Sequence, residues 1–351
     1  MSTALRLGAL AAALLVALGG QAARAGPEEA AWTRIAFGSC LHQDKPQPIL
    51  ETVLAWRPDL LVFAGDNVYG DVTSGEMREL KAAYDKAAAS PGLARLRAAQ
   101  PVLSVWDDHD YGRNDGGGDF PFKATSQRLF LDFWGVPEED PRRRRPGIYT
   151  SAIHGPEGRR VQVILLDTRS FRSPLRPTDR PGAPGRERYL PDPDPAATML
   201  GEAQWRWLEE ELRRPAELRL IVSSVQVLAD GHGFERWGNL PAERRRLLGL
   251  VSRTGAGGVL FLSGDRHIGA LYRLDEEVPY PLHEITSSGL NMIWAASREA
   301  GPHQQGPVYA AENFGTVEVD WQVRELRLAL RGMDGGIVRE ARISLDILEA
   351  R

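Results

Sequence analysis

Short apolar runs that end in polar residues recur along the chain. The runs occupy residues 34–37, 60–64, 102–106, 161–166, 218–222 and 259–262. They lead in turn into the clusters Gly-Ser-Cys, Gly-Asp-Asn, Asp-Asp-His-Asp, Asp-Thr-Arg, Ser-Ser and Ser-Gly-Asp. Near-continuous apolar runs of this length are typical of strands buried on both faces. The pattern therefore predicts a buried sheet whose strands end in polar residues.

Helical patterns lie between these runs. The clearest cover residues 48–56, 76–88, 126–134, 202–213 and 242–253. Strands that alternate with helices indicate an α/β layer fold, in which ligands collect beyond the carboxyl ends of the strands. After His267, alternating segments at 316–321 and 325–330 and a turn at 334–336 predict antiparallel strands that complete a second sheet. We expect a single domain over residues 26–351.

The first 25 residues differ from the rest of the chain. Arg6 precedes an apolar run at 7–18, and residues 23–25 read Ala-Arg-Ala. This is the pattern of a secretory signal peptide over residues 1–25 that is cleaved before Gly26. The apolar run is too short to span ~30 Å of hydrocarbon, and nothing later approaches a transmembrane segment. We therefore expect an exported protein, periplasmic or secreted, with no membrane span after cleavage.

The composition narrows the classes of partner. The chain has 351 residues, of which 42% are hydrophobic and 26% charged, so it can bury a large core. A net charge of −4 gives no electrostatic reason to expect a nucleic-acid partner and leaves a small soluble substrate or a surface lipid open. Cys40 is the only cysteine, so an internal disulfide is excluded. In an oxidising compartment such a thiol should be buried or bound to a metal.

Two irregular stretches interrupt the alternation. Residues 137–146 contain four consecutive arginines at 142–145, and residues 171–195 are dense in Pro, Arg and Asp. Loops of this length in a compact domain are usually functional lids or poorly ordered surface. For the arginine run the sequence favours a solvated face over a contact with phosphate or lipid.

The polar clusters carry the candidate chemistry. Taken singly, each residue has an ordinary explanation: Asp66 as a helix cap, Tyr69 as a core aromatic, His267 as a hydrogen-bonded buried histidine. Gathered at one sheet edge, carboxylates, imidazoles, a thiol and a phenol would repel or remain unsatisfied unless cations bind. Such cations could serve the hydrolysis of a phosphate ester, because two metals about 3.5–4 Å apart can hold both the attacking and the leaving oxygen of an in-line displacement. Asp66 is placed to bridge them, and His109, with an unperturbed pKa of about 6.5, suits protonation of the leaving oxygen.

These residues belong to motifs that resemble those of the PhoD-like alkaline phosphatases, a branch of the calcineurin-like metallophosphoesterases. The matching motifs are F-G-S-C (37–40), G-D-N-V-Y-G-D (65–71), W-D-D-H-D-Y-G-R-N-D (106–115), L-L-D-T-R-S-F-R (165–172), M-L-G-E-A-Q-W-R-W-L-E (199–209), H-G-F-E-R-W-G-N-L-P-A-E-R (232–244), L-S-G-D-R-H (262–267), T-S-S-G-L-N (286–291) and N-F-G-T-V-E-V-D-W (313–321). The resemblance covers nearly the whole chain after residue 25.

The resemblance implies a four-layer α/β/β/α metallophosphoesterase sandwich with two mixed sheets and a metal site between them. It implies ferric iron (Fe3+) and calcium (Ca2+), with other divalent metals open. Carried over by position, the iron ligands are Cys40, Asp66, Tyr69 and His267, and the calcium ligands are Asp66, Asp108, Asn114 and Asp265. Ligand softness agrees, because thiolate, phenolate and imidazole suit a transition metal while carboxylates suit calcium.

Further residues receive weaker assignments. Arg169 either holds a phosphate oxygen with its guanidinium or forms an ion pair that orients Asp167. His232, Trp237 and Asn239 are candidates for the substrate mouth. Gln226 stands where other metallophosphoesterases often carry a metal-binding histidine.

We expect hydrolysis of phosphate esters, monoester and/or diester, small-molecule or lipid, by a metal-activated water. One alternative is a phospholipase D-like phosphodiesterase on the same site. Others are a cysteine hydrolase that uses Cys40 and a metal-binding surface protein without catalysis. The resemblance fails at one point: many members carry twin arginines for export with metal already bound, whereas Arg6 stands alone. This predicts export of the unfolded chain and metal loading afterwards.

Overall fold

The computed structural model describes residues 30–349. The predicted signal peptide lies outside the described residues. Within residues 30–349, no helix combines the length and the apolar character needed to cross a membrane.

The first large sheet is mixed and has the strand order β14-β13-β12-β1-β2-β3. Strands β1, β2 and β3 are parallel, whereas β12, β13 and β14 continue the sheet antiparallel from β1. Their bounds are β1 (Arg34–Gly38), β2 (Leu60–Ala64), β3 (Val102–Val105), β12 (Asn313–Asp320), β13 (Glu325–Gly332) and β14 (Ile337–Ser344).

The second large sheet has the order β10-β11-β9-β8-β5-β4. Its four central strands are parallel, and β4 and β10 are antiparallel edges. The bounds are β4 (Thr150–His154), β5 (Val161–Leu165), β8 (Leu218–Ser223), β9 (Val259–Ser263), β10 (Gly269–Leu274) and β11 (Leu282–Ser287).

Two sequence-based expectations about the sheets are wrong. The antiparallel strands at the C-terminal end do not complete a second sheet, because β12 pairs with β1 and extends the first one. The chemistry-bearing strands do not share one sheet either, since β1 to β3 lie in one sheet and β5, β8 and β9 in the other. Strand pairing across a long sequence separation has no local signature, and for this reason the apolar pattern could not assign strands to sheets.

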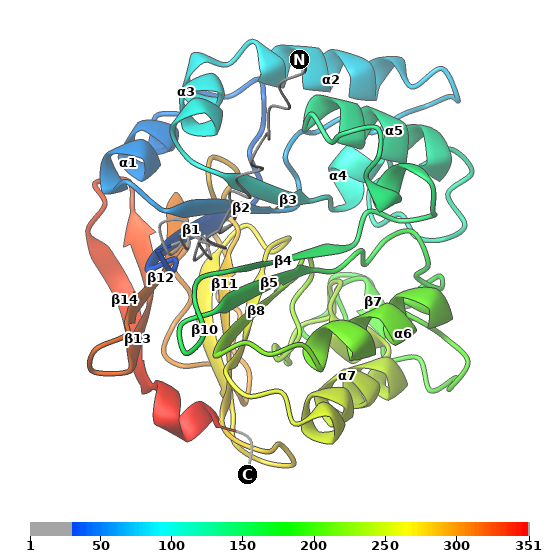
Figure 1. Ribbon diagram of the computed structural model, residues 1–351. Helices are drawn as coiled ribbons and strands as arrows, with labels where there is room; N and C mark the ends of the chain where they lie inside the picture. Colours follow the sequence, from blue (N-terminus) through cyan, green and yellow to red (C-terminus); the bar gives the residue numbers. More distant parts are fainter. Residues whose placement is uncertain (1–29, 350–351) are drawn as a thin grey trace, which may run out of the picture.

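Helices cover the outer faces of the two sheets (Figure 1). One layer holds α1 (Ile49–Trp56), α2 (Arg78–Ala88), α3 (Pro91–Ala99) and α5 (Lys123–Phe133), and the other holds α6 (Gly201–Leu212) and α7 (Pro241–Thr254). Shorter elements are α4 (Asp108–Tyr111), η1 (Pro141–Arg143), η2 (Trp237–Asn239), η3 (Leu345–Leu348) and the hairpin of β6 (Arg176–Pro177) and β7 (Tyr189–Leu190). The predicted four-layer α/β/β/α sandwich with two mixed sheets is confirmed.

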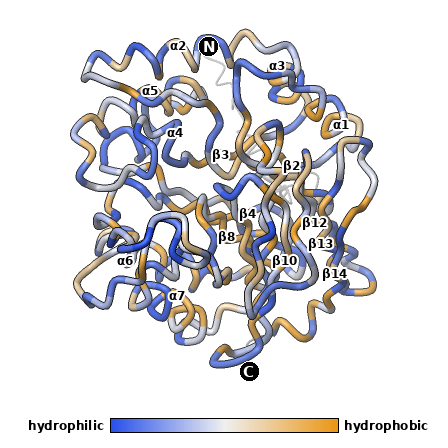
Figure 2. Tube along the Cα trace, turned by 180° about the vertical axis from the view of Figure 1, so that it is seen from behind, coloured by the Kyte–Doolittle hydropathy of each residue, from blue (hydrophilic) through white to orange (hydrophobic). Residues whose placement is uncertain are grey.

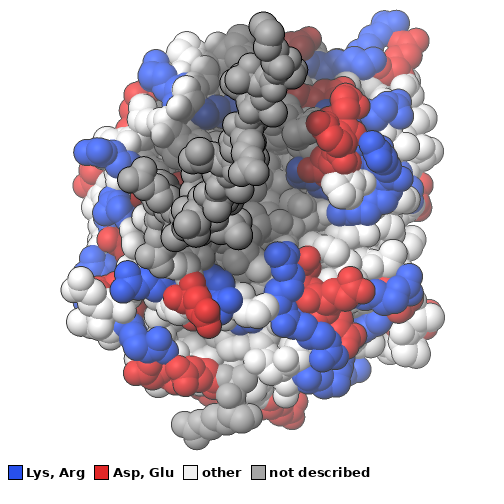
Figure 3. All heavy atoms as spheres, in the orientation of Figure 1, with Lys and Arg blue, Asp and Glu red and all other residues white. Residues whose placement is uncertain are grey.

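The core lies where the two sheets face each other and beneath the helices. Strands β2, β5 and β9 are buried at every position, which explains their uninterrupted apolar sequences. Apolar segments accordingly concentrate in the strands at the centre of the tube in Figure 2. At the surface, the face in Figure 3 shows basic and acidic side chains interspersed rather than gathered by sign.

Candidate active site

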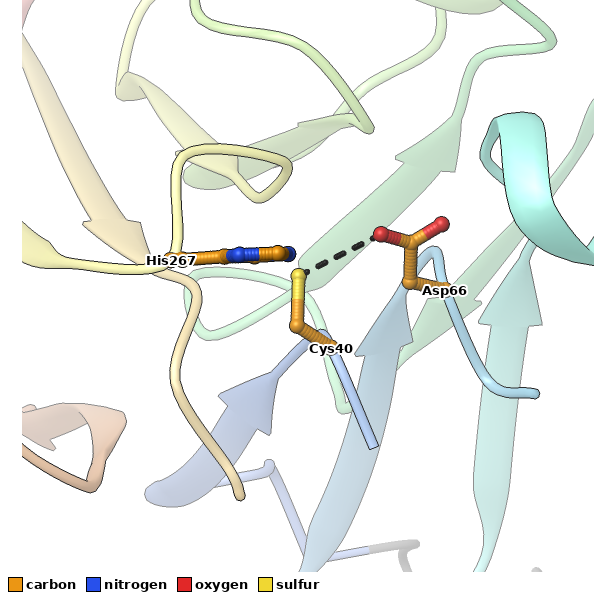
Figure 4. A group of neighbouring side chains, drawn as sticks. All are labelled: Cys40, Asp66 and His267. Atoms are coloured by element: carbon orange, nitrogen blue, oxygen red, sulfur yellow. Dashed lines mark hydrogen bonds between the residues drawn. The ribbon is translucent and has the colours of Figure 1, made fainter. Parts of the chain in front are cut away.

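The site lies where the carboxyl ends of strands from both sheets meet. Cys40 follows β1, Asp66 follows β2 and Asp108 follows β3, while Asp265 and His267 follow β9. Figure 4 shows Cys40, Asp66 and His267 pointing toward one another from three separate loops. A cavity of about 220 Å³ opens beside them. The predicted position of the site, beyond the strand ends, holds in the structure, with the two sheets sharing that edge.

Tight turns place these side chains. Cys40, Asp66, Asp265 and His267 have φ of 62°, 48°, 68° and 56°, in the left-handed region that residues other than glycine seldom adopt. Neighbouring glycines allow the close approach: a Cβ on Gly65 would lie 2.6 Å from Asp107 Cβ, and one on Gly264 would lie 2.8 Å from the Ala64 carbonyl oxygen. Backbone strain of this kind clusters at functional sites.

A first group of ligand atoms joins Cys40, Asp66 and His267. Their ligand atoms lie within 4.8 Å of one another. Cys40 Sγ lies 3.4 Å from Asp66 Oδ2 and 3.0 Å from Ser288 Oγ. Tyr69 Oη lies 3.3 Å from Asp66 Oδ2 and 3.1 Å from His267 Nε2. All four residues predicted as iron ligands therefore meet at one point.

The protonation of this group reflects burial. Burial raises the pKa of the Cys40 thiol to about 12 and raises the pKa of Tyr69 well above its usual value. Burial, with the charge of Cys40 next, also raises the pKa of Asp66. Burial lowers the pKa of His267 to about 4. Without a cation Cys40, Asp66 and Tyr69 therefore hold their protons, which a cation would have to displace, whereas His267 is already neutral.

A second set of ligand atoms continues from Asp66. Asp66, Asp108 and His109 form one group within 4.8 Å, and Asp107, Asp108 and Asp265 form another. Asp265 is 13% exposed, and its Oδ2 has no hydrogen-bond partner and lies 3.8 Å from Arg266 Nη1. Burial raises the pKa of its carboxyl well above the usual value. Buried carboxylates without partners are costly unless a cation satisfies them. The residues present therefore fit a cation next to the first group, near Asp108, which both groups share.

His109 lies at the edge of the cavity. Its ring is 4.4 Å from that of Tyr69, and Nδ1 lies 2.8 Å from Asp71 Oδ2. Burial opposes the charged ring, but the charges of Asp108 and Asp66 prevail and raise the pKa of His109 to about 11. Because Asp71 occupies Nδ1, Nε2 remains as the nitrogen that can give a proton to a ligand.

The other acidic residues of the W-D-D-H-D motif support the loop. Asp110 accepts from the backbone N–H of Asn67 at 3.1 Å and from that of Asp107 at 2.6 Å, which ties the β2 and β3 loops together. Asp107 accepts from Ser224 Oγ at 2.6 Å across the two sheets. Among residues 106–110, only Asp108 and His109 line the cavity.

Arg169 lies behind the cavity rather than in its lining. The side chain is fully buried, and Nε donates to Asp107 Oδ1 at 2.7 Å while Nη1 lies 2.7 Å from Glu235 Oε2. The predicted ion pair with Asp167 is wrong, because the guanidinium pairs with Asp107 and Glu235 and Arg169 gives Asp167 its backbone N–H. The guanidinium holds two buried carboxylates, and this arrangement favours a structural role over a phosphate contact.

The cavity lining includes residues that the sequence did not single out. Asn114, predicted as a calcium ligand, lines the cavity and is joined there by Asp115, Arg188, Phe234, Glu235, Arg266 and Trp294. Asp108, Asp115 and Glu235 also offer ligand atoms within 4.8 Å of one another. The prediction that His232, Trp237 and Asn239 line the mouth is wrong, because all three are buried outside it. Their motif, H-G-F-E-R-W-G-N, instead supplies Phe234 and Glu235.

Gln226 belongs to a buried network. It donates to Tyr272 Oη at 2.9 Å and to Thr286 Oγ1 at 3.0 Å and accepts from His232 Nε2 at 2.9 Å. None of these residues lines the cavity. With its amide satisfied by these three partners, Gln226 gives no sign of metal binding.

Two facing mixed sheets between helical layers, with a carboxylate-rich cavity at their strand ends, define a metallophosphoesterase-like fold. A solved structure of PhoD shares it with a TM-score of 0.66 and 17% identity over 90% of this chain and 69% of that chain. Purple acid phosphatase PPD1 from seeds of yellow lupin (Lupinus luteus) matches with a TM-score of 0.58 and 13% identity over 91% of this chain and 55% of that one.

Residues 35–314 match the PhoD-like phosphatase family, and the chain belongs to this family. A stretch of 244 residues is 24% identical to alkaline phosphatase D of Bacillus subtilis (strain 168). That match covers 60% of this chain and 41% of the relative, so the chain spans less than half of the length of the relative.

Proposed function

We propose that this protein hydrolyses phosphate esters, monoester and/or diester, with the help of bound metal ions. The observation that carries the proposal is the overlap of the groups of ligand atoms, which share Asp66 and Asp108 at one cavity. Membership of the PhoD-like phosphatase family supports the same reaction class. Substrates of this site would be small-molecule or lipid phosphate esters, with no nucleic-acid partner.

The donor sets support two different cations. Thiolate, phenolate and imidazole around Cys40, Tyr69 and His267 suit Fe3+, and the carboxylates of Asp108 and Asp265 with Asn114 suit Ca2+. Asp66 would touch both. Such ions, or other divalent metals in their place, would supply charge for the developing phosphoryl oxygens and a more acidic water.

His109 would act as the general acid. With Nδ1 held by Asp71, Nε2 carries the proton that a leaving oxygen needs. The carboxylates of Asp108 and Asp66 raise the pKa of His109, and cations at those carboxylates would offset the same charges and lower it. A pKa lowered in this way would make the ring a stronger acid toward the leaving oxygen.

The rival cysteine hydrolase has little support. Its nucleophile would be a thiolate, yet Cys40 is fully buried and burial raises the pKa of its thiol to about 12. A phospholipase D-like phosphodiesterase on the same site remains within the proposal, because nothing in the cavity separates the two ester classes.

We also propose export to the periplasm or outside the cell, on the pattern of residues 1–25.

Elemental analysis of the purified protein, followed by a panel of monoesters and diesters with and without added calcium, tests the proposal. We expect metal in the protein and hydrolysis that a chelator removes and metal restores. Hydrolysis that resists chelation and stops on alkylation of Cys40 would refute the metal mechanism in favour of the cysteine hydrolase.

A further inference from the structure

The mouth of the cavity carries an aromatic pair. Phe234 and Trp294 both line it, with ring centroids 5.5 Å apart and ring planes at 80°. Trp294 is 38% exposed, as is the neighbouring Ile293. Large apolar side chains with this exposure are few among the described residues, and of these Trp294 lines the cavity. An apolar surface beside a polar reaction centre is a common feature of ligand sites.

The aromatic pair is held rigidly to the site. The backbone N–H of Trp294 donates to the carbonyl oxygen of His267 at 2.9 Å, so the indole is fixed relative to a candidate metal ligand. Arg266 also lines the cavity and packs against the pair, with its guanidinium carbon 4.0 Å from the Phe234 ring centroid and 5.7 Å from that of Trp294. The guanidinium is paired with Glu299, which offsets its charge. The pair therefore offers ligands an apolar surface.

Arg188 lies at the same mouth and is paired with a carboxylate. Its side chain is 49% exposed and lies 2.6 Å from Asp115, within the predicted irregular stretch 171–195. The lining thus has a polar, carboxylate-rich side and an aromatic side. A phosphate ester has the same division between its charged phosphoryl group and its organic group.

The size of the cavity decides how an ester would lie. At about 220 Å³ the cavity falls below the ~300–1,000 Å³ usual for small-molecule sites. A phosphoryl group fits this space, whereas a large organic group must leave it through the mouth. The exit passes Phe234 and Trp294, so the organic group would lie against these rings.

We propose that Trp294 and Phe234 form a subsite for an apolar, preferably planar, organic group of the ester. This proposal rests on the proposed phosphoesterase function and specifies its substrate class. Aryl and extended apolar esters would bind better than esters of small or highly hydroxylated alcohols, because only the former bury area on the rings.

Calorimetric titration of the metal-loaded protein with phenylphosphonate, methylphosphonate and inorganic phosphate tests the subsite without turnover. We expect the wild type to bind phenylphosphonate roughly 3- to 10-fold more tightly than methylphosphonate, the range that an aromatic contact provides. In Trp294→Ala the ratio should fall below about twofold while the affinity for inorganic phosphate stays within about twofold of wild type. Trp294→Phe should keep most of the preference.

Val323→Ala is the control, since Val323 is an exposed apolar residue, 70% accessible, and lies outside the cavity lining. A phenyl preference that survives in Trp294→Ala, or that is absent from a wild type that binds phosphate and hydrolyses esters, overturns the subsite alone. Failure of the wild type to bind any of the three anions or hydrolyse any ester overturns the proposed function with it. Trp294-dependent binding to phosphatidylcholine vesicles, with no phenyl preference, would make the pair a membrane contact instead.

Discussion

Asp66 is the residue shared by the first and second groups of ligand atoms. Its carboxylate lies beside Cys40 and Tyr69 on one side and within reach of Asp108 and His109 on the other. Its φ of 48° limits what can replace it, because asparagine tolerates the left-handed region better than most residues. A substitution can therefore remove the charge and keep the turn.

We expect Asp66→Asn to fold normally but to lose bound metal and to fall below about 1% of wild-type turnover, since both candidate cations lose a ligand. Metal content, circular dichroism and turnover measured on one preparation test this. Asp85→Asn, an exposed change on α2, is the control. An Asp66→Asn protein with near-normal activity and metal content would overturn the site.

His109→Ala should lower turnover roughly 10²- to 10⁴-fold while metal content stays high, as expected for a general acid. Esters with activated leaving groups such as nitrophenol should lose least, because their leaving oxygens need little protonation. Asp71→Asn should lower turnover in the same direction but less, since it removes only the partner of Nδ1. Loss of metal from His109→Ala would identify His109 as a ligand instead.

Cys40 and Tyr69 allow a test of iron itself. Bound to Fe3+ as anions they should give visible charge-transfer absorption, which Ca2+ and Zn2+ would not give. Because burial raises the pKa of both groups, iron uptake should also release protons. We expect a coloured protein that a chelator bleaches, a band that is lost or shifted in Cys40→Ser and in Tyr69→Phe, and no change in Asp115→Asn. A colourless, active protein that contains only zinc would refute the iron site and keep the phosphoesterase.

At the scale of elements, the loops after β3, β5 and β8 form one buried ionic unit. Arg169 contacts Asp107 and Glu235, and Arg172 contacts Glu235 at 2.9 Å. Asp107 immediately precedes Asp108 of the cavity, so the unit holds the second group of ligands in place. Removing one partner of such a buried pair leaves an uncompensated charge.

Arg169→Ala should lower the free energy of unfolding by about 3–5 kcal/mol, measured by urea denaturation. Arg113→Ala, which removes a half-exposed pair with Asp119, should change it by about 0–1 kcal/mol. A raised KM for esters with unchanged stability would instead show that Arg169 holds phosphate.

Most helices and the strands β1, β2, β3, β5, β8, β9, β12 and β13 could be predicted from apolar patterns, because strands such as β2, β5 and β9 are buried on both faces and keep strong local signals. The strands β4, β10, β11 and β14 were not predicted. The assignment of strands to the two sheets could not be predicted from the sequence, since β12 pairs with β1 from about 280 positions away. The sequence motifs identified the charged and sulfur-containing residues of the site. They did not identify Phe234 and Trp294 as residues of the cavity lining. Aromatic residues on loops look the same in sequence whether they line a mouth or fill a core.

At the scale of the whole molecule, buried carboxyl groups at and behind the cavity keep their protons to unusually high pH in the metal-free protein. Burial raises the pKa of Asp66 and Asp265, and it raises the pKa of Asp107 to about 6 and of Glu235 to about 7. An acid whose pKa is higher in the folded state stabilises the fold below its unfolded pKa, and this contribution is lost as the pH rises. The metal-free protein should therefore lose stability through these groups between about pH 4 and pH 7.

Bound cations reverse this dependence, because they favour the ionised carboxylates. We expect the stabilisation by metal, taken as the difference in unfolding free energy between loaded and chelated protein, to grow with pH over that window. Each proton released adds up to about 1.4 kcal/mol per pH unit. Taking the difference cancels histidines outside the cavity, such as His232 and His283, whose pKa burial lowers in both forms. Asp265→Asn should flatten the slope, since one carboxylate no longer titrates. A metal effect that is constant from pH 4 to pH 7 would mean that the cations bind elsewhere than at these buried carboxylates.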